Sequence, residues 1–139
     1  MFMKIRFIIP WAMLSFLVFA KDPLIKLQTQ GEISFVSGGV GGDERDAMHA
    51  IRSDYNLNLL FSEAGSGEYL SDIKVCIKDA GGNNLLETIA DGPMFYTKLK
   101  PGRYTVSVDL DGNTIDKTVN VGNQQSVSHS FTWPKQQGN

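Results

Sequence analysis

The sequence predicts a mainly β fold with one helix, in which a strand–helix–strand segment leads into an antiparallel β-sandwich. Two observations support this fold class. After residue 70, short runs with apolar residues at every second position alternate with stretches rich in Gly, Pro, Asn and Asp. Before residue 70, one stretch has apolar residues at helical spacing. A chain of 139 residues is long enough to bury a core without a metal or a disulfide.

The N-terminus has the features of a cleaved secretory signal, assigned to residues 1–20. A basic start precedes an uncharged apolar run, Phe7–Phe19, and the small residue Ala20 stands where signal peptidase cuts. A transmembrane anchor is the alternative, but the run is shorter than the roughly 20 residues that span a bilayer, and Pro10 interrupts it. We therefore expect export to the periplasm or the extracellular space, with no stable membrane insertion after cleavage.

Residues 21–30 mix charged and isolated apolar residues without a period, which predicts a flexible lead-in. Residues 31–68 are expected to form a strand, a helix and a second strand. Asp43 is the expected helix cap. One apolar stripe on the helix consists of Ala47, Met48, Ile51 and Tyr55. In the strand that follows, Leu57, Leu59 and Phe61 share one face.

Residues 69–133 are expected to form the sandwich, and residues 134–139 a tail. Residues 31–133 would then form a single folded unit. The predicted strands are Ile73 to Lys78, Leu85 to Ala90, Met94 to Leu99, Arg103 to Leu110, Thr114 to Val121 and Ser126 to Trp133.

The fourth and fifth of these strands form the clearest hairpin, and its register can be predicted from the apolar pairs. A turn at Gly112–Asn113 is favoured over one at Asp111–Gly112 because it matches more apolar residues across the strands. The pairs are then Leu110 with Ile115, Val106 with Val119 and Tyr104 with Val121. This register places Lys117 on the inner face opposite Val108, which requires its ammonium group to reach an edge.

The stretch LKPGRYTVSV, Leu99 to Val108, is interpreted as a corner between two strands rather than as a functional motif. Leu99 ends one strand with a core contact, Pro101 sets the backbone for a turn, and Tyr104 returns to the core. No residue in this stretch is required to touch a substrate.

Residues 69–121 resemble the carboxypeptidase regulatory-like domains, which have a transthyretin-like β-sandwich fold. The resemblance rests on the Ile-x-Val-x-Ile strand, the DGPMF turn, the Leu-x-Pro-Gly-x-Tyr-x-Val corner and the Gly112 hairpin. The stretches VSGGVGGDERDAM and DYNLNLLFSEAGSGEYL are similar to a group of small exported proteobacterial proteins of unknown function. The resemblance implies an accessory, spacer or adhesion module. Hydroxyisourate hydrolases share the transthyretin fold but end in Tyr-Arg-Gly-Ser, which this chain lacks.

Charge and cysteine content narrow the classes of partner. Removal of Lys4 and Arg6 with the signal leaves 11 Lys and Arg against 15 Asp and Glu, a net charge of −4. Such acidity argues against nucleic acid or anionic lipid as the main partner. Cys76 is the one cysteine, so an internal disulfide is excluded. Strand alternation places it beside Lys74 and Lys78, opposite the apolar face.

The chemical motifs in the sequence are incomplete, so we expect no enzyme activity, no cofactor and no metal. The glycine-rich stretch 37–42 lacks the Lys of a phosphate loop and is followed by acidic residues. The acidic stretch 109–116 lacks the spacing of a calcium loop. The sequence has two histidines, His49 and His129, which are too few for most metal sites without carboxylate ligands. A hydrolase would need His129 to meet Ser128 or Ser130 and an acid, but neighbours on a strand point to opposite faces.

Met94, Tyr96 and Trp133 form the candidate interaction surface. Met94 and Tyr96 have the opposite parity to Phe95, so they either lie exposed or pack under the helix. The leading hypothesis is a non-catalytic structural or protein-interaction module whose partner is another envelope protein, bound through this surface or a sheet edge. The alternative is a domain that binds a small molecule or a glycan in a concave site between helix and sheet. Hydrolase activity is the third hypothesis.

Overall fold

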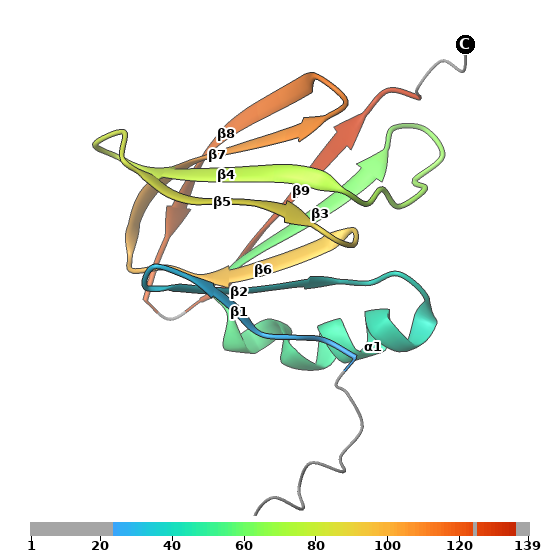
Figure 1. Cartoon of the computed structure of the whole chain (residues 1–139), viewed down its shortest axis with the longest axis horizontal. Helices are drawn as coiled ribbons and strands as arrows, with labels where there is room; N and C mark the ends of the chain where they lie inside the picture. The colour runs from blue at the N-terminus through green and yellow to red at the C-terminus, as the bar shows by residue number, and fades with distance from the viewer. Residues whose placement is uncertain (1–23, 124, 136–139) are drawn as a thin grey trace, which may run out of the picture.

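The computed structural model describes residues 24–123 and 125–135, arranged as two facing β-sheets with one helix on the outside (Figure 1). The predicted signal peptide, residues 1–20, and the start of the lead-in lie outside the described residues. The mainly β fold and its two-sheet sandwich are confirmed, with one α-helix among these residues. The prediction that the sandwich lies within residues 69–133 is wrong, because strands that precede residue 69 belong to one of its sheets.

The strands predicted from the alternation pattern are present within one residue of their expected bounds. The five-stranded sheet has the order β1-β2-β6-β3-β9. Its strands are β1 (Gln28–Gln30), β2 (Ile33–Gly38), β3 (Leu57–Glu63), β6 (Met94–Lys98) and β9 (Val127–Trp133). The four-stranded sheet has the order β5-β4-β7-β8. Its strands are β4 (Ile73–Asp79), β5 (Asn84–Ala90), β7 (Gly102–Leu110) and β8 (Asn113–Val121).

The main core fills the space between the two sheets. Every second residue along the strands points a side chain into it. On β3, Leu57, Leu59 and Phe61 face inward as predicted. The prediction of a purely antiparallel sandwich is wrong at one pair, because β9 runs parallel to β3. Phe131 therefore lies beside Phe61 on the same face. On β4, the fully buried core residues are Ile73, Val75 and Ile77.

A second, smaller core lies on the outer face of the five-stranded sheet. The helix α1 (Gly42–Ile51) and the 3₁₀ turn η2 (Arg52–Asp54) cover this face, on the side away from the other sheet (Figure 1). Met48 is fully buried at the centre of the contact. Its cluster consists of Val36, Met94 and Tyr96, with Ile25, Ile51, Tyr55 and Leu60 at the periphery. The predicted apolar stripe therefore faces a core, and this core is separate from the main one.

The predicted helix cap is wrong. Gly41, at φ 91°, occupies the cap position, and Asp43 lies inside the first turn without a capping hydrogen bond. The backbone N–H groups that precede the helix are bound instead by Glu44, whose Oε1 accepts from Gly39 N at 3.0 Å and Val40 N at 3.3 Å. A residue with positive φ is needed at the turn, and glycine adopts it without strain.

Part of the predicted flexible lead-in is also ordered. Gln28–Gln30 forms β1, which pairs antiparallel with β2 through a tight turn at Gly31, at φ 62°. The polar sequence of β1 has no apolar alternation because its three residues lie exposed at the sheet edge. Backbone pairing, which the side-chain pattern does not encode, creates this strand.

The hairpin register differs from the predicted one by a shift of two. The turn is Asp111–Gly112, with φ 49° and 91°. The observed pairs are Val108 with Ile115, Tyr104 with Val119 and Gly102 with Val121. A shift of two leaves the same side chains on the inner face, so apolar matching cannot discriminate the registers. Turn chemistry decides, because a type I′ hairpin turn needs positive φ at both central positions, and Asp-Gly suits it.

The LKPGRY corner has the architectural role expected of it. Leu99 and Tyr104 are buried, and the Tyr104 hydroxyl donates to Lys100 O at 2.6 Å across the turn. The Asn56 side chain binds both backbone groups of Leu99: Oδ1 accepts from its N–H at 2.9 Å and Nδ2 donates to its carbonyl at 2.7 Å. The corner is therefore held to the start of β3.

Candidate functional site

The predicted exposed surface at Met94, Tyr96 and Trp133 is wrong. Met94 and Tyr96 are 5% and 3% exposed, because α1 packs over them. The alternative interpretation, in which these two residues pack under the helix, is confirmed. Trp133 is 1% exposed in the main core, and its Nε1 donates to Asn113 O at 2.8 Å. None of the three side chains is exposed on the surface of this fold.

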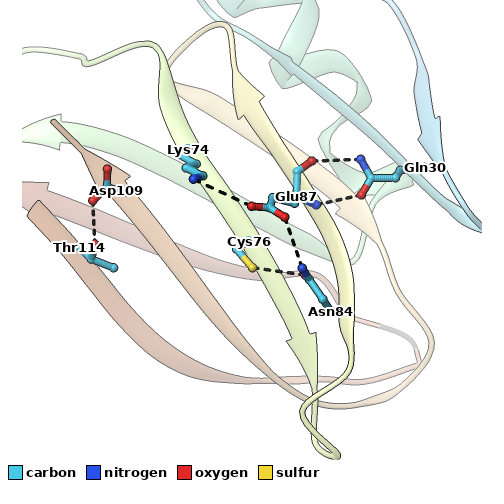
Figure 2. Close-up of polar contacts among 7 residues, drawn as sticks. All are labelled: Gln30, Lys74, Cys76, Asn84, Glu87, Asp109 and Thr114. Carbon is cyan, nitrogen blue, oxygen red and sulfur yellow. Dashed lines mark hydrogen bonds and ion pairs between the residues drawn. The ribbon is translucent and has the colours of Figure 1, made fainter. Parts of the chain in front are cut away.

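The sheet edges, the second predicted mode of interaction, are partly closed by side chains. At the edge of β5, the Gln30 side-chain amide binds the backbone of Glu87. Its Nε2 donates to Glu87 O at 3.0 Å, and its Oε1 accepts from Glu87 N at 2.9 Å (Figure 2). Both backbone groups of Glu87 are thereby used. The bond from Trp133 to Asn113 links β9 to β8 in the same way at the opposite side of the sandwich.

Lys117 closes the sandwich further on that side. As predicted, it belongs to the inner face of β8, although it pairs with Val106 rather than Val108. Its Nζ donates to Ser130 O at 2.6 Å and lies 4.6 Å from the centroid of the Phe131 ring. Its ammonium group reaches the edge where β8 and β9 meet, and there it binds a backbone carbonyl.

The residues of the hydrolase hypothesis point in different directions. His129 lies with Phe131 on the inner side of β9, and burial, followed by the positive charge of Lys117, lowers its pKa. Ser128 Oγ, on the other face, accepts from Arg52 Nη2 at 2.7 Å. The charged group that acts on His129 is thus a cation, whereas a catalytic base is usually oriented by an acid.

Cys76 lies on the outer face of the four-stranded sheet beside Lys74 and Lys78, as the alternation predicted. Its thiol donates to Asn84 Oδ1 at 3.3 Å, and Asn84 Nδ2 donates to Glu87 Oε1 at 3.4 Å (Figure 2). Lys74 Nζ lies 3.9 Å from Glu87 Oε2, so the lysine is paired with the carboxylate. The immediate partner of the thiol is a neutral amide.

The structure reveals a surface that sequence reasoning missed, which we call the N-terminal patch: Leu24, Leu27 and Val40. Their side chains are 61%, 63% and 56% exposed. All three line one hollow of about 580 Å³ between the segment before β1 and the start of α1. The available signal was the presence of leucines in an otherwise polar lead-in and of a valine among glycines.

The described part of the chain contains no helix long and apolar enough to cross a membrane. Within the same residues, no three side chains of His, Cys, Asp and Glu are grouped as metal ligands. Asp109, from the acidic stretch that lacks calcium-loop spacing, accepts from Thr114 Oγ1 at 2.7 Å (Figure 2). It also accepts from Gly112 N at 3.2 Å. These bonds lower its pKa and stabilise the hairpin turn.

Comparison with known proteins does not identify a family for this chain. No protein-family model matches this chain. No curated protein matches it either.

Proposed function

We propose that this chain is an exported, non-catalytic module that binds another protein of the cell envelope through the N-terminal patch. One observation carries the proposal. Of the five large hydrophobic side chains that are exposed in the described residues, three converge on one hollow. Clustered exposed apolar surface beside polar residues is typical of protein-interaction sites, whereas single exposed residues are common everywhere.

The partner chemistry follows from what surrounds the N-terminal patch. The strand β1, which begins next to Leu27, is the terminal strand of its sheet, so part of its backbone can pair with an added strand. Lys26, Glu44 and Asp91 line the hollow, which gives it an acidic excess. An extended segment of the partner, with apolar side chains followed by a lysine or arginine, would complement this surface.

Export and the finer fold assignment belong to the same proposal. The basic start and apolar run of residues 1–20 support a cleaved signal. The LKPGRY corner and the two-sheet architecture support a transthyretin-like sandwich of the carboxypeptidase regulatory-like kind. In such proteins the domain serves as an accessory or spacer. The placement of His129 near the cation Lys117, and the bond of Ser128 to Arg52 on the other face, support a non-catalytic role.

The experiment is photo-crosslinking in living cells. A photo-reactive amino acid replaces Leu27 in the full-length chain, and a matched protein carries it at Ile89, which is 58% exposed on β5, outside the N-terminal patch. We expect a discrete crosslinked partner at Leu27 that is absent at Ile89. Introducing Val40→Asp should abolish this crosslink, because a charge in the hollow opposes burial of an apolar segment.

Two results would overturn the proposal. One is the same crosslinking pattern at both positions, and the other is a Leu27 crosslink that persists in the Val40→Asp protein. Mass spectrometry of the mature N-terminus tests the export component separately, since cleavage after Ala20 leaves a chain that begins at Lys21.

A further inference from the structure

A crevice between the end of the helix and the outer face of the five-stranded sheet contains an arginine whose position is set by two side chains. Arg52 Nη2 donates to Ser128 Oγ at 2.7 Å. With the Asn58 amide oriented to satisfy its hydrogen bonds, its oxygen accepts from Arg52 Nε at 3.3 Å and its nitrogen donates to Leu57 O at 3.2 Å. The guanidinium is therefore anchored to β3 and β9.

Asn58 is unusual in its position. It is 4% exposed on β3, on the face where Leu60 belongs to the apolar cluster beneath the helix. Burying an amide is unfavourable unless its hydrogen bonds are made, and an apolar residue would fill this site at lower cost. What Asn58 provides that a leucine cannot is an acceptor that orients Arg52.

The guanidinium retains binding capacity after these two bonds. A guanidinium has five N–H groups, and Ser128 and Asn58 use two of them. Neither of the two ion pairs found in the described residues includes Arg52. No carboxylate is present among the described residues that line the crevice. One oriented cation thus faces the crevice without a counter-ion among the described residues.

The other lining groups define the size and chemistry of a ligand. The crevice has a volume of about 110 Å³. That is the share of about four water molecules in the liquid, so there is room for a small anionic group with a short stem. Its further polar residues are His49, Tyr96, His129 and Ser130, and its apolar residues are Leu59, Leu60 and Met94. Burial raises the pKa of Tyr96, which keeps its hydroxyl protonated and able to donate.

We propose that this crevice binds a carboxylate with a short aliphatic stem, either as a free acid or as the end of a larger molecule. The planar fork of a guanidinium matches the two oxygens of a carboxylate. A single cation among neutral donors suits a monoanion better than a dianion such as phosphate. Arg52 is the binding residue, and Asn58 is a positioning residue. The site is separate from the N-terminal patch and does not depend on the function proposed for it.

The test is titration of the mature, isotope-labelled protein with propionate, followed by amide NMR. Propan-1-ol serves as the neutral analogue, sodium chloride as the ionic-strength control and inorganic phosphate as the dianion. We expect saturable shifts at His49, Arg52 and Ser128 with propionate at millimolar concentrations, and none with propan-1-ol. Arg52→Gln should weaken binding about tenfold or more, because charge-assisted hydrogen bonds are lost. Arg103→Gln, an exposed arginine on β7, is the matched control and should bind as the wild type does.

Asn58→Leu distinguishes positioning from stability. We expect this variant to bind propionate several-fold more weakly while its melting temperature stays the same or rises, since a buried amide is replaced by an apolar group. Arg52→Lys keeps the charge but loses the fork, and should also bind more weakly. The proposal is overturned if propionate causes no saturable shifts, if Arg52→Gln leaves them unchanged, or if phosphate or propan-1-ol binds as tightly.

Discussion

At the scale of single residues, His129 is a polar side chain placed where a strand pattern calls for an apolar one. It lies on the inner side of β9, and burial lowers its pKa below the ordinary value of 6.5, with the nearby charge of Lys117 as a second cause. The folded protein therefore binds a proton at this position less readily than the unfolded chain does, and this difference couples stability to pH.

The sign of the coupling gives a prediction. As the pH falls through 6.5, the unfolded chain gains the His129 proton first, so the free energy of unfolding decreases until the lower, folded pKa is passed. His129→Gln should lose less stability than the wild type between about pH 8 and pH 5. Melting temperatures of both proteins across this range provide the measurement. Parallel curves would contradict the assignment, since the two proteins differ only at residue 129.

A second residue-scale prediction concerns Gly92, in the turn before β6. A Cβ at this position would lie 2.4 Å from the carbonyl oxygen of Gly38 and 2.5 Å from its carbonyl carbon. Both contacts are with backbone at the end of β2, which cannot move aside as a flexible side chain can. Gly92→Ala should therefore lower the free energy of unfolding by about 3 kcal/mol or more, by overpacking.

The control for Gly92→Ala is Gly42→Ala at the start of α1, where a Cβ would meet nothing within 4 Å. Urea denaturation should show no loss for this variant, because alanine is also the better helix former. Equal stability of the two variants would mean that the close approach of Gly92 to Gly38 is not a constraint.

At the scale of elements, side chains from each sheet bind backbone groups at the edge of the facing sheet. Gln30 pairs with both backbone groups of Glu87 on β5, and Lys117 and Trp133 bridge β8 and β9. An unprotected edge strand is a template for pairing with another chain. These contacts therefore limit self-association as well as joining the two layers.

We predict that Gln30→Ala opens the β5 edge. The contact is exposed, so the stability loss should be small, about 0.5–1 kcal/mol. Hydrogen exchange at the Glu87 amide should accelerate, and sedimentation should show more self-association at high concentration. Thr29→Ala, one position earlier on β1, is the control and should leave both readouts unchanged. An unaltered Glu87 exchange rate in Gln30→Ala would refute this role of the edge contact.

At the scale of the whole molecule, the fold has three layers: the four-stranded sheet, the five-stranded sheet and the helix (Figure 1). The five-stranded sheet is apolar on both faces over β6, since Phe95 belongs to the main core while Met94 and Tyr96 belong to the helix cluster. Loss of the helix contact would expose an apolar sheet face to water.

Met48 tests this arrangement, because it is 0% exposed at the centre of the helix contact. Met48→Ala should cost about 2–4 kcal/mol in the free energy of unfolding, from lost burial and from the cavity left behind. It should also increase binding of a hydrophobic dye through exposure of Met94 and Tyr96. Asp46→Ala, an exposed position on the same helix, is the control, and a similar result for both variants would show that the helix is not a structural layer.

The strands of this protein could be predicted from the sequence more fully than its surfaces. Inward positions such as Val75 and Phe61 follow from alternation alone, and so does the placement of Cys76 beside two lysines. The alternative hypothesis placed a concave site between helix and sheet, where the Arg52 crevice lies. The residues of this crevice and of the N-terminal patch could not be predicted, because each site unites residues from separate elements. Arg52 meets Ser128 across 76 positions of sequence. A polar residue within the apolar start of β3, Asn58, was the one local signal.

The sequence by itself determined which residues alternate, where the strands after residue 70 lie and that one helix forms, because these properties depend on the spacing of neighbouring side chains. The tertiary structure alone decided that the helix covers Met94 and Tyr96, that Gln30 closes the edge of β5, and that Arg52 is oriented by Asn58. Alternation assigns a side chain to a face of a sheet. Only the packing of distant segments decides whether that face is covered or exposed to water.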